Sequence, residues 1–327
     1  MHVLGLDAGG TKTVCVLADG DGATIDEGRA PGANLQGQDS AGVEQALAAA
    51  IAAALGGRRV VPDAVCAGIA GVDREEDVRA AAAILQRLTA SPRILIVNDA
   101  LVALVSGVGD GPGIVIIAGT GSIVYGRNAA NQAARAGGWG HIIGDEGSGY
   151  WIGREALAAV VRDVDGRGPA TELTRAVSGH FGLADISGLV RIVYDRELPR
   201  ASVAAIGPIV QDAAAAGDAV ATRILERAAA ELVAAAQAVA SRLEMRGDSF
   251  RFVLAGGVFG VVPWLASELT RRLVEVAPRS DVRRLEVEPA AGAVHLALAH
   301  ARGGAHLPTY AHPNLPDSPR RGARTGR

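Results

Sequence analysis

The chain has 327 residues, of which 49% are hydrophobic and 20% are charged, a composition with enough apolar material for a large core and against intrinsic disorder. The 32 basic and 35 acidic residues give a net charge of −3, which argues against nucleic-acid binding because no basic excess is available to replace phosphate counterions. The two cysteines, Cys15 and Cys66, form no CxxC pair, which argues against a disulfide scaffold, a structural zinc site and a redox motif.

The N-terminus lacks the positive start and long apolar stretch of a signal peptide. No apolar run approaches the ~18 residues of a membrane span. These features predict a cytoplasmic protein without a membrane partner. At roughly 150 residues per domain, the length predicts about two domains.

The first glycine-rich segment lies between two apolar runs, residues 3–8 and 14–18, and predicts a β-hairpin. Its tip carries Gly9, Gly10, Thr11 and Lys12. In a P-loop a helix follows the glycines and lysine follows glycine directly, so neither the order of elements nor Thr11 fits that motif. Backbone N–H groups of such a turn, together with a threonine hydroxyl, can surround an anion.

Asp7 ends the first predicted strand, beside this tip. A carboxylate repels phosphate, so its place there is explained if a Mg²⁺ ion stands between the two. Lys12 is the only lysine in the chain. It is either a phosphate ligand or a solvated hairpin residue.

Asp73 predicts a capped helix over residues 74–88. The next apolar run, residues 93–97, ends in Asn98 and Asp99 before another helix. Ligands of open α/β sheets bind beyond the carboxyl ends of strands, which places Asp99 where a catalytic base meets a substrate hydroxyl. The alternative is that Asn98 or Asp99 only caps the helix.

Glycines cluster between Ser106 and Gly113, which predicts a domain boundary. Directly after it, the runs 114–118 and 123–125 flank a second glycine tip. This tip carries Gly119, Thr120, Gly121 and Ser122. Two such tips facing each other would hold a polyphosphate from both sides, and the alternative is that each is merely a tight turn.

Residues 137–151 are too rich in glycine for a helix and too polar for a core strand, so a structured loop is predicted. Asp145 and Glu146 are candidates for hydrogen bonds to sugar hydroxyls. Trp139 either packs on a sugar face or anchors the loop in the core, and His141 is interpreted as structural. Paired carboxylates also occur in glycosidases, but that function would leave the glycine tips without a purpose.

The C-terminal part continues the α/β pattern. Apolar periodicity predicts helices over 218–243, 263–276 and 290–301, and a strand precedes the glycines at 256–257. The chain therefore divides into two similar α/β halves, residues 1–106 and 107–302. The segment 303–327, rich in proline and arginine, is predicted to be a disordered tail.

In chain order, five motifs resemble those of the BadF/BadG/BcrA/BcrD-type ATPase family, which includes the N-acetylglucosamine kinases. They are the segments 5–13, 97–100, 118–122, 137–148 and 255–258. The match covers about residues 3–300. The GGWGHxxGDEGS run is specific to the family, whereas the first and last motifs are shared with sugar kinases, actin and heat-shock ATPases.

The resemblance implies an α/β fold of two actin-like, ribonuclease-H-like domains with ATP in the cleft between them. It implies an ATP- and Mg²⁺-dependent hexosamine 6-kinase that acts on an amino sugar, with N-acetylglucosamine favoured, and a homodimer. Asp99 would be the base and Asp7 the metal residue. The implied ATP residues are Gly9, Gly10, Thr11, Lys12, Gly119, Thr120, Gly121, Gly256 and Gly257. The implied substrate residues are Asn34, Asp99, Ser122, Gly138, Trp139, Gly140 and Asp145.

Three alternatives follow from the family. Ile123 stands where several N-acetylglucosamine kinases carry Asn, and it cannot make the same hydrogen bond, so glucosamine or a broader hexosamine range is one alternative. The activator ATPases of 2-hydroxyacyl-CoA dehydratases ligate an iron–sulfur cluster through cysteines, a role that the strand positions of Cys15 and Cys66 disfavour. A sugar-sensing regulator is disfavoured by Asp99 and by the lack of a helix-turn-helix extension.

Overall fold

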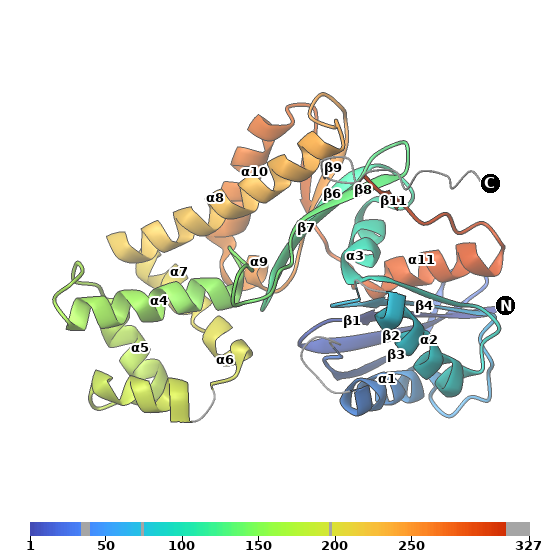
Figure 1. Ribbon diagram of the computed structural model, residues 1–327, viewed down its shortest axis with the longest axis horizontal. Helices are drawn as coiled ribbons and strands as arrows, with labels where there is room; N and C mark the ends of the chain where they lie inside the picture. Colours follow the sequence, from blue (N-terminus) through green and yellow to red (C-terminus); the bar gives the residue numbers. More distant parts are fainter. Residues whose placement is uncertain (34–39, 73–74, 196–197, 312–327) are drawn as a thin grey trace, which may run out of the picture.

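The computed structural model describes residues 1–33, 40–72, 75–195 and 198–311, and its chain forms two β-sheets with helices around and between them (Figure 1). The first half comprises β1 (His2–Ala8), β2 (Lys12–Asp19), β3 (Thr24–Pro31), α1 (Ser40–Leu55), β4 (Ala64–Ile69), α2 (Glu75–Thr89), β5 (Ile94–Asn98) and α3 (Asp99–Val108). The next segments are β6 (Gly113–Ala118), β7 (Ser122–Arg127), β8 (Gln132–Gly137), α4 (Gly149–Val164), α5 (Leu173–Phe181), a 3₁₀ turn (Ile186–Gly188), a π-helical turn (Arg191–Asp195), α6 (Arg200–Ala204) and α7 (Gly207–Ala215). The last are α8 (Ala219–Arg242), β9 (Arg251–Ala255), α9 (Val258–Val261), α10 (Pro263–Val276), β10 (Asp281–Arg284), α11 (Ala290–Ala301) and β11 (Thr309–Tyr310).

The two sheets share one topology. The first sheet has the order β3-β2-β1-β4-β5, and the second has the order β10-β9-β6-β7-β8-β11. In each half, three strands form an antiparallel meander and two further strands add in parallel beside the first strand. The order β8-β7-β6-β9-β10 thus repeats β3-β2-β1-β4-β5, which confirms two similar α/β halves that each open with a glycine-tipped hairpin.

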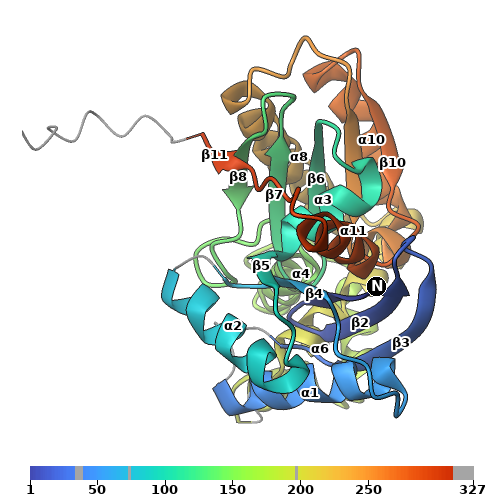
Figure 2. The same ribbon diagram turned by 90° about the vertical axis from the view of Figure 1, so that its right-hand side faces the viewer.

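Helices cover both faces of the first sheet and join it to the second. Helix α1 packs on β2 and β3, and α2 packs on β5. On the opposite face α11 packs on β1 and β4 and against α3, which also contacts β6, β7 and β9 of the second sheet. Helices α3 and α11 therefore lie between the sheets (Figure 2), and α8 covers the far face of the second sheet.

Three apolar clusters fill these layers. One lies between the first sheet and helices α1 and α2, and one lies between the second sheet and the helices α4 to α10. The third is central and combines residues of both halves, among them Val97, Leu101, Tyr125 and Ala293. Burial of apolar surface is the main stabilising contribution in such a core, so the central cluster fixes the relative position of the two glycine hairpins.

The predicted helices of the C-terminal half are confirmed as α8, α10 and α11. The carboxylate of Asp218 accepts hydrogen bonds from the amides of Val220 and Ala221, which satisfies two of the free N–H groups at the start of α8. Helix α2 covers the predicted segment with bounds shifted by one residue, and its expected cap, Asp73, lies outside the described residues.

The prediction of a disordered tail from residue 303 is wrong for its first part. Strand β11 pairs in parallel with β8, and the side chain of Asn131 donates hydrogen bonds to the carbonyls of His306 and Leu307. The ring of Tyr310 meets that of Tyr125 edge to face, with 6.2 Å between the centroids. The edge of the second sheet thus orders a segment whose composition alone argues against structure. Residues 312–327 lie outside the described part.

Within the described ranges, no single helix is both long enough and apolar enough to cross a membrane, although the bent pair Leu173–Phe181 and Ile186–Tyr194 meets the length and composition together.

Candidate active site

The two glycine hairpins meet at their tips. The first tip joins β1 to β2, where the amide of Gly9 donates to the carbonyl of Lys12 at 3.0 Å. The second joins β6 to β7, where the amide of Gly119 donates to the carbonyl of Gly121 at 2.9 Å. The hydroxyl oxygens of Thr11 and Thr120 lie 3.1 Å apart. Two turns that are 109 residues apart in sequence therefore face each other, as the sequence predicts for a polyphosphate site.

Asp7 lies at the carboxyl end of β1, just before the first tip, with 9% of its surface exposed. Burial, and next to it the negative charge of Asp99, raise the pKa of the Asp7 carboxyl to about 7, while the charge of Lys12 lowers it. A buried carboxyl whose proton affinity is raised by burial and by a neighbouring carboxylate is electrostatically suited to a cation.

The approach of Asp7 and Asp99 depends on a glycine between them. The register of the first sheet places Gly68 beside Asp7 on one side and beside Val97 on the other. A Cβ atom on Gly68 would lie 2.4 Å from Cγ2 of Val102 and 3.3 Å from Cα of Asp99. Only a residue without a side chain lets the first turn of α3 come this close to the strand.

Asp99 is the first residue of α3, and the helix has its own cap. The side chain of Asn98 accepts a hydrogen bond from the amide of Ala100 at 2.9 Å, and Asp99 Oδ1 accepts from the same amide at 3.0 Å. Asn98 alone therefore suffices as the cap. Helix capping therefore does not require Asp99, although its carboxylate also accepts the bond from the Ala100 amide.

Lys12 takes part in an ion pair that the sequence does not reveal. Its Nζ lies 2.6 Å from Glu288, whose other oxygen lies 3.0 Å from Arg29. Both cations hold the pKa of the Glu288 carboxyl below its usual range, against the effect of its burial. Glu288 precedes α11, so this pair connects the first tip to the C-terminal part of the chain, and Lys12 lies beside the site with its charge already balanced.

The loop between β8 and α4 is bonded to the second tip. Asp145 Oδ1 accepts from the amide of Ser122 at 3.3 Å, and the hydroxyl of Ser122 donates to the carbonyl of Glu146 at 2.7 Å. Asp145 is buried, and burial raises the pKa of its carboxyl. A Cβ atom on Gly121 would lie 2.9 Å from an oxygen of Asp145. Asp145 and Ser122 thus brace the second tip from behind.

The same loop presents Trp139 to solvent. This side chain is 66% exposed. Of the two roles that the sequence leaves open, packing on a sugar or anchoring the loop in the core, the core anchor is therefore excluded. The guanidinium of Arg135 lies 5.7 Å from the centre of the Trp139 ring, within cation–π distance. Gly138 and Gly140, on either side of Trp139, both have positive φ angles, of 72° and 83°. The ring of His141 packs edge to face on Tyr150, a structural contact.

The third glycine motif lies next to the second tip. Gly256, between β9 and α9, has a φ angle of +104°, and a Cβ atom there would lie 2.3 Å from the carbonyl oxygen of Ala118. The neighbouring Gly257 has no atom within 4 Å of such a Cβ position. Open space beside the second tip is suited to a group attached to the bound phosphates.

The residues at the first tip meet the requirements of a magnesium site. Mg²⁺ in phosphoryl-transfer enzymes is bound through one or two carboxylates, substrate phosphates and retained waters. Asp7 and Asp99 supply carboxylate oxygens beside the facing tips. Over the described ranges, no group of three His, Cys, Asp or Glu side chains gathers into a metal site.

Asn34 lies outside the described residues. The amide of the preceding Ala33 donates to the carbonyl of Gly9 at 3.0 Å, so the chain enters that segment beside the first tip.

The two cysteines are buried and lie in different apolar clusters, Cys15 on the α1 side of the first sheet and Cys66 on the α11 side. Burial raises the pKa of both thiols, which disfavours thiolate ligands.

Comparison with known proteins agrees with this geometry. The model of the BadF/BadG/BcrA/BcrD ATPase family matches residues 4–297. An N-acetylmuramic acid/N-acetylglucosamine kinase from Clostridium acetobutylicum is 35% identical over 90% of this chain and 98% of its own length. An N-acetyl-D-glucosamine kinase from Dictyostelium discoideum is 32% identical over 90% of this chain and 97% of its own.

Solved structures share the fold. A structure of a candidate N-acetylglucosamine kinase from Chromobacterium violaceum has a TM-score of 0.75 and 27% identity, over 91% of this chain and 98% of its own. A ROK family glucokinase from Streptomyces griseus, in complex with glucose and AMPPNP, has a TM-score of 0.57 and 21% identity, over 93% of this chain and all of its own. The latter supports the two-domain sugar-kinase fold alone.

Proposed function

The chain belongs to the BadF/BadG/BcrA/BcrD ATPase family, and from this premise we propose that it is an ATP-dependent hexosamine 6-kinase. The favoured reaction converts N-acetylglucosamine and ATP into the sugar 6-phosphate and ADP. Two relatives named as N-acetylglucosamine kinases, each at least 32% identical along nearly the whole chain, support this acceptor.

The observation that carries the proposal is the contact between Thr11 and Thr120, with Asp99 nearby. A phosphate chain inserted at this contact would accept hydrogen bonds from both hydroxyls and from the glycine amides of both tips. Gly10 and Gly121 are the implied ATP residues proposed to supply those amides. The amides of Gly9 and Gly119 close the two turns instead, so these glycines are proposed to shape the tips around the phosphates. Gly256 and Gly257 are proposed to lie beside the nucleoside, with open space at Gly257. Lys12 is proposed as a further ATP residue at the edge of the site, where it is paired with Glu288.

Phosphoryl transfer depends mostly on positioning and charge neutralisation. In the proposed mechanism, Asp99 accepts the proton of the sugar 6-hydroxyl as its oxygen attacks the terminal phosphorus of ATP, and ADP leaves. Mg²⁺, when bound, would neutralise phosphate charge, and Asp7 is the residue proposed to hold it. Asn98 keeps the amino end of α3 capped, which fixes the base.

The proposed sugar site lies beside Asp99 and the loop that carries Gly138, Trp139 and Gly140, with Asn34 as a further ligand. Exposed aromatic rings of this kind pack on sugar faces. Asp145 and Ser122 are proposed as further sugar-site residues, and the hydrogen bond between them holds the loop against the second tip.

The choice of acceptor is part of the proposal. Ile123 packs against Gly138, where a Cβ atom would lie 2.9 Å from its Cδ1, and offers no hydrogen bond to an acetamide. Glucosamine and a broader hexosamine range are therefore alternative acceptors, and the name of one relative adds N-acetylmuramic acid. Closure of the two proposed domains, 1–106 and 107–302, would exclude water. Cytoplasmic location and a homodimer are further parts of the proposal, supported by the family resemblance.

The activator ATPase is the competing class. Its iron–sulfur cluster needs thiolates that are brought together, and the opposite placement of Cys15 and Cys66 in the first sheet argues against it. A colourless anaerobic preparation would agree with this argument.

An ADP-release assay tests the function directly. Purified protein with Mg²⁺ and ATP is given N-acetylglucosamine, glucosamine, N-acetylmuramic acid, N-acetylmannosamine or glucose, and ³¹P NMR identifies the phosphorylated oxygen. We expect sugar-dependent ADP release and a 6-phosphate. ADP release that none of the sugars stimulates would contradict a hexosamine kinase, and a 1-phosphate product would contradict the role of Asp99.

A further inference from the structure

Charged side chains gather on the α11 face of the first sheet, beside the first tip. The pairing register places Asp7, Val14 and Arg29 side by side across β1, β2 and β3, and Val14 belongs to the central apolar cluster that includes α11. Side chains alternate between the two faces of a strand, so Lys12 lies on the same face as Val14. Glu288 lies just before the start of α11 and meets these side chains there.

Glu288 bridges two cations at the first tip. One of its carboxylate oxygens lies 2.6 Å from Nζ of Lys12, and the other lies 3.0 Å from Arg29. Arg29 also bonds to Glu27 of its own strand, at 2.6 Å. Because both oxygens are bonded, the carboxylate has a fixed orientation and restricts the long side chain of Lys12, which otherwise has many rotamers. A lysine ammonium has three donors, so one bond to Glu288 leaves others for a phosphate oxygen.

Helix α3 holds the start of α11 from behind. The hydroxyl of Ser106, near the end of α3, donates to the carbonyl of Pro289 at 2.9 Å and accepts from the amide of Gly292 at 2.8 Å. A Cβ atom on Gly292 would lie 2.1 Å from the carbonyl oxygen of Val102. Only glycine lets the two helices come this close, and the residue that precedes Pro289 is Glu288, which therefore has a fixed place relative to α3.

Helix α11 also lies directly against β1, the strand that leads into the first tip. A Cβ atom on Gly5 would lie 2.4 Å from the amide nitrogen of Val294. The contact needs a residue without a side chain, so strand and helix are packed backbone to backbone. The start of α11 is thus positioned by the same strand that carries Asp7.

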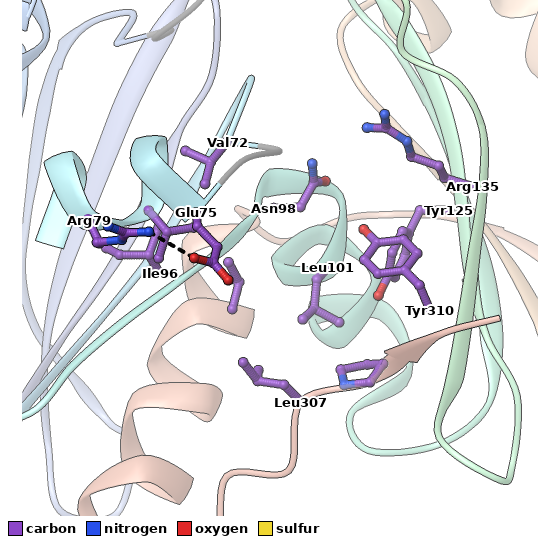
Figure 3. A pocket seen from close by; sticks show the side chains of 13 residues that line it. Val72, Glu75, Arg79, Ile96, Asn98, Leu101, Tyr125, Arg135, Leu307 and Tyr310 are labelled. Atoms are coloured by element: carbon purple, nitrogen blue, oxygen red, sulfur yellow. Dashed lines mark hydrogen bonds and ion pairs between the residues drawn. The ribbon is translucent and has the colours of Figure 1, made fainter. Parts of the chain in front are cut away.

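The two sides of α3 are unlike. Figure 3 shows one side, where Asn98 and Leu101 face a chamber of about 650 Å³ between β5 and the strands β7, β8 and β11. The opposite side packs on α11. Because the chamber leaves the first side open, the contacts with α11 contribute to the placement of α3, and with it of Asp99 at its start.

On the basis of the proposed nucleotide site, we propose that Glu288 is a positioning residue for phosphoryl transfer. It holds the ammonium group of Lys12 at the first glycine tip, where the phosphate chain is proposed to bind, and α11 gives it a fixed place relative to Asp99. Glu288 makes no contact with the nucleotide in this proposal. Its own negative charge repels ATP, so its role depends on the lysine that it orients.

Glu288→Gln distinguishes orientation from charge, because the two act in opposite directions. The variant removes the ion pair with Lys12 and one negative charge near the phosphates. If only that charge mattered, kcat/KM for ATP would rise or stay the same. If orientation matters, kcat/KM for ATP falls, and we expect a decrease of about tenfold, near the lower end of the range for a lost charge-assisted hydrogen bond. ADP release at saturating sugar and varied ATP measures it.

Glu27→Gln is the matched control. It removes a carboxylate of the same charge from the same network, but within the described residues Glu27 bonds to Arg29 and not to Lys12. Its kcat/KM for ATP should stay within about twofold of the wild type, the scale of an exposed ion pair. A decrease as large as that of Glu288→Gln would overturn the proposal, since it would assign the effect to the charge of the network.

Lys12→Met gives a second test through a double-mutant cycle. If Glu288 acts through Lys12, Glu288→Gln causes no further decrease in a protein that already carries Lys12→Met, so the two effects are not additive. Additive decreases would overturn the proposal. Urea unfolding of each variant verifies that it is folded. If Glu288→Gln does not fold, the same cycle is measured with Glu288→Asp, whose shorter side chain keeps the charge.

Nucleotide titration separates this proposal from the kinase function. If the wild type phosphorylates a hexosamine and kcat/KM for ATP is not lowered in Glu288→Gln, the role of Glu288 alone is rejected. If no sugar stimulates ADP release, the Kd for ATP decides. A higher Kd in Glu288→Gln than in the wild type would keep the role of Glu288 at the nucleotide site and reject the kinase function, and an equal or lower Kd would reject both.

Discussion

Asp99 is the first residue of α3 and follows directly after Asn98, whose side chain caps the helix. The capping role and the proposed catalytic role thus belong to different residues. The sequence places a carboxylate there but does not decide between a base and a cap. The structure shows that Asn98 provides the capping oxygen, so replacement of Asp99 by its isosteric amide should leave the helix formed.

Asp99→Asn is the first prediction. An amide cannot accept the proton of the sugar hydroxyl, so kcat should fall about 10²- to 10⁴-fold, with the Kd for ATP changed less than threefold. Steady-state kinetics and nucleotide titration measure the two effects. Asp21→Asn, at an exposed turn between β2 and β3, is the matched control. Near-normal turnover in Asp99→Asn would exclude Asp99 as the base.

Asp7 gives a prediction about pH. In the unfolded chain its carboxyl titrates near its ordinary pKa of 3.8, and in the folded chain near 7. Between these values the folded state holds a proton that the unfolded state has lost, so the contribution of Asp7 to stability is lost as pH rises. In metal-free buffer, Asp7→Asn should lack this loss, which by pH 8 amounts to at most about 4 kcal/mol, since the shift covers about three pKa units of roughly 1.4 kcal/mol each.

Urea unfolding at pH 5 and pH 8, with a chelator present, measures this difference. The groups that titrate elsewhere in the molecule are common to both proteins, so the comparison isolates Asp7. Parallel stability curves for the two proteins across this range would show that Asp7 is ionised in the folded state and would contradict the raised pKa.

At the scale of residues, the sequence predicts groups whose neighbours are local and misses those whose neighbours are distant. Thr11 and Thr120 are recognisable because each stands in a glycine turn after an apolar strand. Glu288 is not, because nothing in its local sequence shows that it bonds to Lys12, 276 residues away. Asp145 is predicted as a sugar ligand, and its bond to the amide of Ser122 behind the second tip becomes visible only in the fold.

At the scale of elements, adjacent glycines can serve different purposes, and Gly256 and Gly257 illustrate this. Gly256 has a positive φ angle and no room for a Cβ atom beside the carbonyl of Ala118. Gly257 has a φ angle of −66° and open space around it. Gly256 thus holds the junction between β9 and the second tip, whereas Gly257 borders the space proposed for the nucleotide.

We therefore predict that two neighbouring alanine substitutions affect different properties, stability in one case and ATP binding in the other. Gly256→Ala should lower the free energy of unfolding by roughly 3 kcal/mol, because strained backbone and a backbone clash combine. Gly257→Ala should change it by less than about 1 kcal/mol and should raise the Kd for ATP instead, since the new methyl group occupies space proposed for the nucleoside. Denaturant unfolding and nucleotide titration provide the readouts, and equal destabilisation by both variants would refute the distinction.

Periodicity and caps predict most elements, because they are properties of short segments. The two hairpins, α8, α10 and α11 follow from apolar runs with glycine, Asp218 or Pro263 at their ends. The order of strands in each sheet does not, since it depends on crossovers between distant segments. Strand β11 is missed for a related reason: its pairing with β8 depends on contacts from Asn131, and its own composition predicts a tail.

At the scale of the whole molecule, the C-terminal segment connects the two halves. Helix α11 packs on β1 and β4 of the first sheet, and β11 then pairs with the edge of the second sheet. The central apolar cluster contains residues of α11 together with residues of β5, β6 and β7. The halves are thus held together by the end of the chain as well as by α3, although their sheets arise from separate parts of the sequence.

This arrangement gives a last prediction, from two truncated proteins. The variant that ends at Ala311 keeps β11, and the variant that ends at Arg302 lacks it, so their difference isolates the strand. Loss of the Tyr310 contact with Tyr125 and of the pairing with β8 should lower the free energy of unfolding by about 2 kcal/mol. Because α11 is intact in both, the shorter variant should still bind ATP with unchanged affinity. Equal unfolding curves would mean that β11 does not stabilise the molecule, and loss of ATP binding in the shorter variant would mean that β11 is needed to keep the two glycine tips facing each other.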